Sequence, residues 1–226
     1  MEVTYLMNSG LLIEAGGKKM IIDALSGNTE YFDKMPKKLV TEITKGKGIF
    51  ENLNAMLFTH DHVDHFNEET ANLCRKNNDL EWVFIPEEEE TCPSFVEKNL
   101  EDVQIFCLKI PHSGKEFRNV KHYAFLIRHE GDSIYVSGDS ELQEPTQISM
   151  LGGVPVTKAF FNGFHLQFEK GRKIIEGIKA ETTYIYHIPL KKDDKHGIRK
   201  AVIANQKKYK NLQANCVLLL ENMVKV

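Results

Sequence analysis

The sequence predicts a mixed α/β fold, and three observations support this prediction. Apolar runs of strand length outnumber segments with helical spacing, and several predicted helices follow or separate strands. The chain shows no internal repeat, low-complexity tract or linker, so we expect residues 1–226 to form a single domain. Four apolar runs end in a residue that can bind a metal, namely His60, His112, Asp139 and His187. Because adjacent strands end at one edge of a sheet, these side chains are expected to converge.

The first part of the chain is predicted to consist mainly of strands. Short apolar runs precede Asp23, and Gly16-Gly17 has the composition of a hairpin turn between two of them. A short helix is expected over 38–45. The apolar run 53–60 is typical of a buried strand, and it leads directly into a cluster of histidines.

The middle and the end of the chain alternate between the two kinds of element. A helix is expected to begin after the N-cap Asn67 and to be followed by a strand over 81–86. The acidic stretch 87–100 is predicted to be helical from Pro93 or Ser94 onward. The remaining predictions are a strand over 103–113, a hairpin over 122–140, a strand and loop over 156–164, a helix over 167–180, a strand over 182–189, a helix over 195–211 and a strand over 216–226.

Composition limits the class of protein. The hydrophobic fraction of 42% and the charged fraction of 27% are ordinary for a globular protein, and the net charge of −3 argues against charge-driven binding of nucleic acid. The first residues lack the pattern of a signal peptide, and no apolar run is long enough for a membrane span. We therefore expect a cytoplasmic protein whose cysteines are reduced: Cys74, Cys92, Cys107 and Cys216.

The segment "FTHDHVDHF", residues 58–66, has the residue types of a metal site. His60 and His62 can reach one metal from a loop, whereas in a helix they would point about 200° apart. Asp64 and His65 follow directly and could face a second metal. Imidazole with carboxylate suits zinc, manganese or iron, and the lack of a nearby cysteine ligand favours a catalytic over a structural site.

These residues resemble the metal-binding signature of the metallo-β-lactamase superfamily. Other segments are similar to the family in the same order: "LLIEAGGKKMIIDAL" ending in Asp23, "IPHSG", "IYVSGDS" and "TYIYHI". The resemblance covers about residues 8–188 and implies a four-layer αββα sandwich. Within the superfamily, the opening "NSGLLIE" looks most like the ascorbate-6-phosphate lactonase-like and general metal-dependent hydrolase branch.

The resemblance also implies two divalent metal ions, with zinc expected and manganese or iron as alternatives. The first would be held by His60, His62 and His112. The second would be held by Asp64, His65 and His187, with Asp139 bridging the two. His122 is an alternative to His112 for the first metal, although a position beside the site fits it better. Two such metals would activate a bridging water as hydroxide, which makes a hydrolase the expected function.

Several residues are candidates for roles in addition to, or beside, metal binding. Asp64 is expected to orient the nucleophile as well as to bind metal, and Asp23 could fix a ligand histidine through its second ring nitrogen. His165 is a candidate general acid, with capping or packing as the alternative. Asn162 and Gly163 lie in the same loop and could line the pocket.

The substrate is expected to be a small ester, lactone or phosphorylated metabolite. Basic residues after His187 could offer positive charge to an anionic substrate, or they could form a solvated loop: Lys191, Lys192, Lys195 and Arg199. Three aromatic residues could form an apolar wall, although core packing is the preferred interpretation: Tyr123, Phe164 and Phe168. The alternative functions are a phosphodiesterase or ribonuclease of the same fold and a non-catalytic metal or ligand sensor. The oligomeric state is open.

Overall fold

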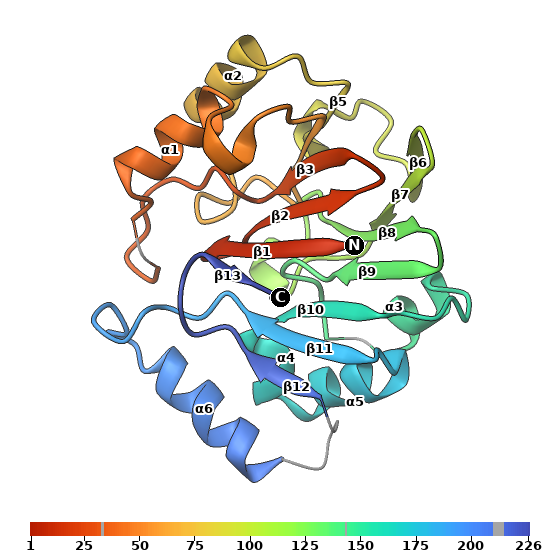
Figure 1. Ribbon diagram of the computed structural model, residues 1–226. Helices are drawn as coiled ribbons and strands as arrows, with labels where there is room; N and C mark the ends of the chain where they lie inside the picture. Colours follow the sequence, from red (N-terminus) through yellow and green to blue (C-terminus); the bar gives the residue numbers. More distant parts are fainter. Residues whose placement is uncertain (33, 143, 210–214) are drawn as a thin grey trace.

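The computed structural model describes residues 1–32, 34–142, 144–209 and 215–226. Within these residues the strands form two sheets, one with the order β13-β1-β2-β3-β4-β5 and one with the order β12-β11-β10-β9-β8-β7-β6 (Figure 1). The strands of the first sheet are β1 (Glu2–Met7), β2 (Gly10–Ala15), β3 (Lys18–Ile22), β4 (Ala55–Leu57), β5 (Trp82–Phe84) and β13 (Val224–Lys225). Those of the second are β6 (Phe95–Leu100), β7 (Val103–Lys109), β8 (Tyr123–His129), β9 (Asp132–Val136), β10 (Lys158–Asn162), β11 (Thr182–Tyr186) and β12 (Cys216–Leu218).

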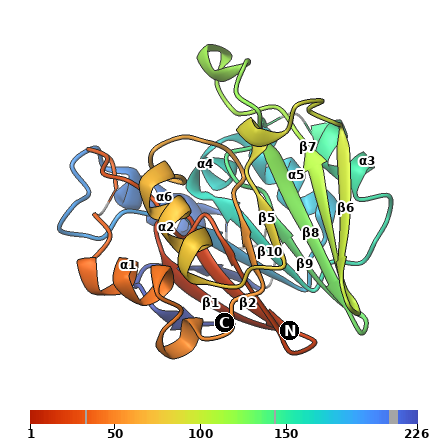
Figure 2. The same cartoon turned by 90° about the horizontal axis from the view of Figure 1, so that it is seen from above.

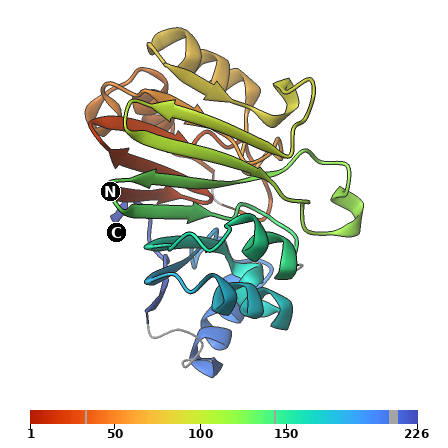
Figure 3. The ribbon, with the colours of Figure 1, turned by 90° about the vertical axis from the view of Figure 1, so that its right-hand side faces the viewer.

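Helices cover the outer face of each sheet. The α-helices are α1 (Lys37–Thr44), α2 (Glu68–Asn77), α3 (Glu144–Met150), α4 (Gly163–Gln167), α5 (Glu169–Ile178) and α6 (Ile198–Lys208). Short 3₁₀ turns are η1 (Gly48–Phe50), η2 (Pro86–Glu88) and η3 (Lys115–Phe117). Figure 3 shows α1 and α2 on one side of the strands and the later helices on the other. No helix in the described part of the chain is long and apolar enough to cross a membrane.

Alternating side chains of the strands build the layers. Ile22 and Leu57 belong to the core between the two sheets, whereas their neighbours Ile21 and Met56 pack with Ile43 of α1. The period of two residues along a strand produces this division. In the second sheet Phe160 faces the other sheet while Phe161 packs beneath α5. The predicted four-layer αββα arrangement is therefore confirmed.

Several local predictions are also confirmed. Gly16 and Gly17 have φ values of 55° and 72° in the turn between β2 and β3, a conformation that glycine adopts without steric cost. The side chain of Asn67 caps α2 by accepting a hydrogen bond from the Thr70 backbone N–H. All four cysteines are free thiols.

Other predictions are wrong because long-range pairing overrides local pattern. Residues 95–100, predicted as a helix, form the edge strand β6, which pairs along its length with β7. The predicted final strand splits into β12 and β13, which belong to different sheets. The helices α3 and α4 were not predicted. The predicted helix over 195–211 corresponds to α6, and its last two positions, 210 and 211, lie outside the described residues.

The topology places several strand ends at one edge of the molecule. β3 pairs with β4, and β9 with β10 and β10 with β11, in parallel register. Asp23, His60, Asp139 and His187 follow the carboxyl ends of β3, β4, β9 and β11. Asp23 and His187 have positive φ values of 48° and 56°, which turn the chain sharply where each strand ends. This edge is where a ligand site is expected in sheets with parallel strands.

Candidate metal centre

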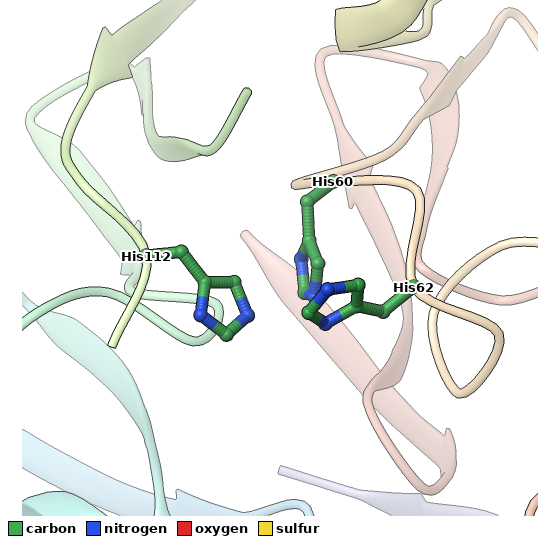
Figure 4. A group of neighbouring side chains, drawn as sticks. All are labelled: His60, His62 and His112. Carbon is green, nitrogen blue, oxygen red and sulfur yellow. The ribbon is translucent and has the colours of Figure 1, made fainter. Parts of the chain in front are cut away.

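One group of three histidines forms around the loop after β4. His60 and His62 come from this loop, and His112 comes from the segment after β7 (Figure 4). The ring centroids of His60 and His112 are 4.7 Å apart, and those of His62 and His112 are 4.6 Å apart. Ligand nitrogens of the three residues all lie within 4.8 Å of one another. They are close enough to hold a single metal ion.

A second group lies next to the first and contains both carboxylates. Its members are Asp64, His65, Asp139 and His187. The Nε2 atoms of His65 and His187 are 3.1 Å apart, and His187 Nε2 lies 3.3 Å from Asp64 Oδ2. Asp139 Oδ2 lies 3.5 Å from His65 Nε2 and 3.9 Å from His112 Nε2. One carboxylate oxygen thus sits between the two groups, and the structure brings all seven predicted metal-binding side chains together.

Asp23 and Thr59 form buried hydrogen bonds that hold His65 of this cluster in place. Asp23 is buried, and its Oδ1 accepts a hydrogen bond from the Thr59 backbone N–H at 2.8 Å. Its Oδ2 accepts from the Thr59 hydroxyl at 2.7 Å and lies 2.8 Å from His65 Nδ1. A carboxylate at Nδ1 holds the proton there and leaves Nε2 of His65 free to bind a metal. Asp23 therefore occupies the supporting position that the sequence predicts.

A buried chain of side chains holds Asp139 from the opposite side. The Asn162 side-chain amide donates to Asp139 Oδ1 at 2.8 Å. The carbonyl oxygen of that amide lies 2.9 Å from His165 Nδ1, and His165 Nε2 lies 3.4 Å from the Ser140 hydroxyl. His165 is fully buried and does not line the cavity, whereas Asn162 does. The position of His165 favours the packing alternative over the predicted general acid.

Charge and burial set the protonation states of the metal-free cluster. Burial and the neighbouring His65 hold the pKa of His60 well below its ordinary value, so its imidazole is neutral. Burial alone would lower the pKa of His65, but the Asp139 and Asp23 carboxylates outweigh it and raise the pKa well above its ordinary value. His65 is therefore protonated in the metal-free protein, and a metal ion would displace the proton from Nε2. Burial opposes ionisation of Asp64, yet the histidines around it lower its pKa to about 2. Its carboxylate is ionised at neutral pH.

The donor set fits a metal ion. Nε2 of His60 and Nε2 of His112 are buried and have no hydrogen-bond partner within the described part of the chain. A buried nitrogen without a partner is costly, and a metal ion would supply the missing interaction. His112 Nδ1 lies 2.6 Å from the Ser113 carbonyl oxygen, an arrangement that leaves the lone pair on Nε2. Imidazole and carboxylate together suit zinc, manganese or iron.

His122 lies beside the first group and outside it. Its ring centroid is 5.2 Å from that of His60, and its Nδ1 lies 2.9 Å from the Ile110 carbonyl oxygen. Its Nε2 points at Gly138, where an added Cβ would come within 2.6 Å. Gly138 also has a positive φ of 55°, so the chain has two reasons for glycine there. The geometry agrees with the preference for His112 over His122.

A cavity of about 700 Å³ opens above the two groups. Its walls include aromatic side chains at Tyr31, Phe32, Phe117, Phe164 and Phe168. Phe164 and Phe168 are 40% and 53% exposed, so the core-packing interpretation was wrong for both. Tyr123 is fully buried and donates to the Pro93 carbonyl oxygen, in agreement with that interpretation.

Of the two alternatives for the basic residues after His187, the cavity supports the solvated loop over a positively charged lining. Among the described residues that line the cavity there is no lysine or arginine. The guanidinium of Arg199 instead donates to the carbonyl oxygens of Pro189 and Leu220, and it lies 3.6 Å from the Glu221 carboxylate. Lys192 pairs with the neighbouring Asp193. Arg199 therefore joins segments on either side of α6, whereas the Lys192 side chain is 77% exposed and its ion pair contributes little to stability.

Sequence reasoning missed three residues that contact the predicted ligands, namely Phe32, Phe117 and Thr59. Phe32 stacks on His187 at a centroid distance of 3.9 Å and an angle of 20°. Phe117 lies 4.8 Å from His62 and 5.0 Å from His112. Phe32 and Phe117 come from segments outside the histidine motif, and no local pattern marks them. Thr59, in contrast, directly precedes His60, and its place beside the motif was a usable signal.

Buried His165 leads to a prediction about pH and stability. Burial lowers the pKa of His165 to about 4, whereas the unfolded side chain titrates near its ordinary 6.5. Between these values the unfolded chain binds the proton and the folded chain does not. His165 should therefore contribute up to about 3 kcal/mol to the decrease in the free energy of unfolding of the metal-free protein as the pH drops from about 6.5 to about 4.

Urea unfolding at several pH values measures how the free energy of unfolding depends on pH. The variant His165→Gln, which removes this titrating group, should show a shallower decrease over the same pH range. An identical decrease in both proteins would contradict the assignment of this part of the slope to His165.

Comparison with known proteins gives matches in structure only. Neither a family model nor a curated protein matches the sequence. An isothiocyanate hydrolase from Delia radicum gut bacteria superposes with a TM-score of 0.67 at 13% identity, covering 100% of this chain and 98% of that chain. The metallo-β-lactamase fold protein YhfI from Bacillus subtilis gives 0.65 at 12% identity, with coverage of 100% and 98%.

A third structure has a different reported chemistry. CmlA, a diiron β-hydroxylase from Streptomyces venezuelae, gives a TM-score of 0.68 at 12% identity; the match covers 100% of this chain, which spans 53% of the CmlA chain. Identities this low establish the fold and leave the activity and the lactonase-like branch as predictions. The two sheets, the outer helices and these superpositions lead to one conclusion: the chain has the metallo-β-lactamase fold.

Proposed function

We propose that this protein is a hydrolase of small molecules that uses two divalent metal ions. The observation that supports this most directly is the position of Asp139 Oδ2 between the two ligand groups, 3.5 Å from His65 Nε2 and 3.9 Å from His112 Nε2. The first ion would be held by His60, His62 and His112. The second would be held by Asp64, His65 and His187, with Asp139 shared between them.

Metal ions bound there would lower the pKa of water toward neutrality and polarise an oxygen of the substrate. The chain supplies the positioning. Asp23 holds the Nδ1 proton of His65, and Asn162 holds Oδ1 of Asp139 so that Oδ2 faces the two groups. His165 in turn holds the Asn162 carbonyl oxygen, which gives it a positioning role in place of proton donation. Asp64, ionised and 19% exposed, lies at the cavity and can orient the attacking water.

The nucleic-acid alternative fits the cavity less well. A phosphodiester substrate needs positive charge to bind its backbone, and binding of this kind weakens steeply with salt. The described residues that line the cavity include no lysine or arginine, and the whole chain has a net charge of −3. We therefore propose a small-molecule substrate.

Metal analysis with a hydrolysis screen tests the proposal. After reconstitution with zinc, manganese or iron, we expect close to two ions per chain and hydrolysis of at least one member of a panel of esters, lactones, thioesters, phosphodiesters, phosphorylated sugars and a β-lactam. Chelation should remove the activity and re-addition of the metal should restore it. Full hydrolysis at one ion or less per chain would contradict the two-metal site. Two bound ions without any hydrolysis would favour the sensor alternative.

A further inference from the structure

The cavity above the metal centre has an aromatic wall. We call Tyr31, Phe32, Phe117, Phe164 and Phe168 the aromatic rim. The volume of the cavity, about 700 Å³, lies within the range of pockets that bind small molecules, about 300–1,000 Å³. A cavity of this size can enclose one small molecule, and the metal-binding side chains form part of its wall.

The exposed apolar surface of the protein is concentrated at this cavity. Within the described residues, ten large apolar side chains are exposed, and five of them line the cavity: Tyr31, Val63, Phe117, Phe164 and Phe168. Single exposed apolar side chains are normal on a protein surface, but a contiguous group marks a binding site. This group lies directly over the predicted metal ligands.

The aromatic rim approaches both halves of the cluster. Phe32 stacks on His187 of the second group, and Phe117 contacts His62 and His112 of the first. Phe117 belongs to η3, in the loop that projects from the molecule in Figure 2. Phe164 and Phe168, on α4 and directly after it, stack at a centroid distance of 6.4 Å. A bound molecule would therefore contact apolar surface immediately beside the reacting position.

The charges of the cavity wall disfavour an anionic ligand. Apart from the metal-binding cluster itself, the charged residues among the described lining are Glu30 and Glu116. Basic side chains instead gather in a smaller groove that adjoins the cavity at His112, where Lys115, Arg118 and Lys170 lie together with Glu141. An anionic group on the aromatic rim would lose its hydration without gaining a partner, which is costly.

We propose that the aromatic rim selects an uncharged substrate whose aryl or alkyl group lies on the rim while its electrophilic carbon reaches the His/Asp cluster. A neutral ester of a phenol is the simplest example. Its hydrolysis consumes one water, breaks the bond between the acyl carbon and the aryloxy oxygen, and releases the carboxylic acid and the phenol. The catalytic part of this inference rests on the proposed function, whereas the binding part does not.

A matched pair of esters tests the selection. Phenyl butyrate and the monophenyl ester of succinate differ chiefly in a terminal methyl group against a terminal carboxylate. We expect kcat/KM of the metal-loaded protein to be at least about 10-fold higher for phenyl butyrate, a factor that corresponds to about 1.4 kcal/mol. The double variant Phe164→Ala, Phe168→Ala should raise KM for phenyl butyrate by about 5-fold or more. Phe95→Ala is the matched control, since Phe95 is 48% exposed on β6 and does not line the cavity.

An equal or higher kcat/KM for the succinate ester would overturn the inference. In that case the double variant Lys115→Ala, Arg118→Ala would be measured with both esters. Loss of the preference for the succinate ester in this variant would identify the adjoining groove as the site that binds the carboxylate. Circular dichroism establishes that each variant folds.

Probe binding separates this inference from the proposed function. The neutral fluorescent dye N-phenyl-1-naphthylamine should bind the metal-free protein, and the Phe164/Phe168 double variant should weaken that binding by about 5-fold or more while Phe95→Ala leaves it unchanged. If no ester is hydrolysed but dye binding depends on the rim, the proposed function fails and the apolar site stands. Dye binding that is equal in all three proteins would overturn the apolar site.

Discussion

Replacing Asp64 by alanine is expected to reduce hydrolysis by more than about 100-fold, beyond the effect of losing an outer-shell partner of a metal ligand. The carboxylate lies 3.3 Å from His187 Nε2 and its pKa is lowered to about 2, so it is an ionised member of the second group. Its removal takes away both a proposed ligand and the group that would orient water. Metal analysis of the variant should show close to one ion per chain, while circular dichroism should show an unchanged fold.

The same loop offers a matched control. Asp61 lies three positions earlier, is exposed, and belongs to neither ligand group. Asp61→Ala should therefore retain two ions and full activity. Equal activity in Asp64→Ala and Asp61→Ala would contradict the assignment of Asp64.

Replacing Asp23 is expected to lower both the stability of the fold and the affinity for metal, and two different variants measure these two effects. Asp23→Ala removes the acceptor of the Thr59 N–H and hydroxyl and of the His65 Nδ1 proton, and it places alanine at a positive φ of 48°. Buried groups left without partners cost about 1–3 kcal/mol each, so a loss of about 3–5 kcal/mol in the free energy of unfolding is expected. Urea unfolding of the metal-free protein measures it.

The conservative variant Asp23→Asn tests the effect of Asp23 on metal binding. Asparagine tolerates the positive φ and still accepts from the Thr59 N–H, but its amide group cannot accept the Nδ1 proton of His65. The affinity of the second group for metal should fall about 10–100-fold in competition with a chelator. Retained affinity in Asp23→Asn would show that Asp23 supports the fold alone.

The metal-binding residues could be predicted from the sequence to a larger extent than the residues that surround them. The motif residues from His60 to His65 are close in sequence, and their ligand chemistry is local, so the residue types alone indicated a metal site. His112, Asp139 and His187 were identified by their places after apolar runs together with the family resemblance. The structure brings these side chains within a few ångströms of the motif, because the parallel strands before Asp139 and His187 end at the same edge.

The errors arose where a local pattern competed with long-range contacts. Residues 95–100 follow an acidic stretch and resemble a helix, but pairing with β7 makes them a strand. The basic residues after His187 left an anion site open as one of two alternatives, and the hydrogen bonds of Arg199 to the backbone around α6 decide against it. Phe164 and Phe168 were expected in the core because large aromatic residues are usually buried, yet they stand at the cavity mouth.

By itself, the sequence indicated a metal site at the motif from His60 to His65, because ligand identity and close spacing are local properties of the chain. The division of the ligands into two groups came from the family resemblance. Only the tertiary structure decided what surrounds them. Phe32 and Phe117 meet the histidines, and the cavity wall excludes lysine and arginine among its described residues, through contacts between segments distant in sequence. The direction of an exposed side chain depends on that long-range packing, which no local pattern encodes.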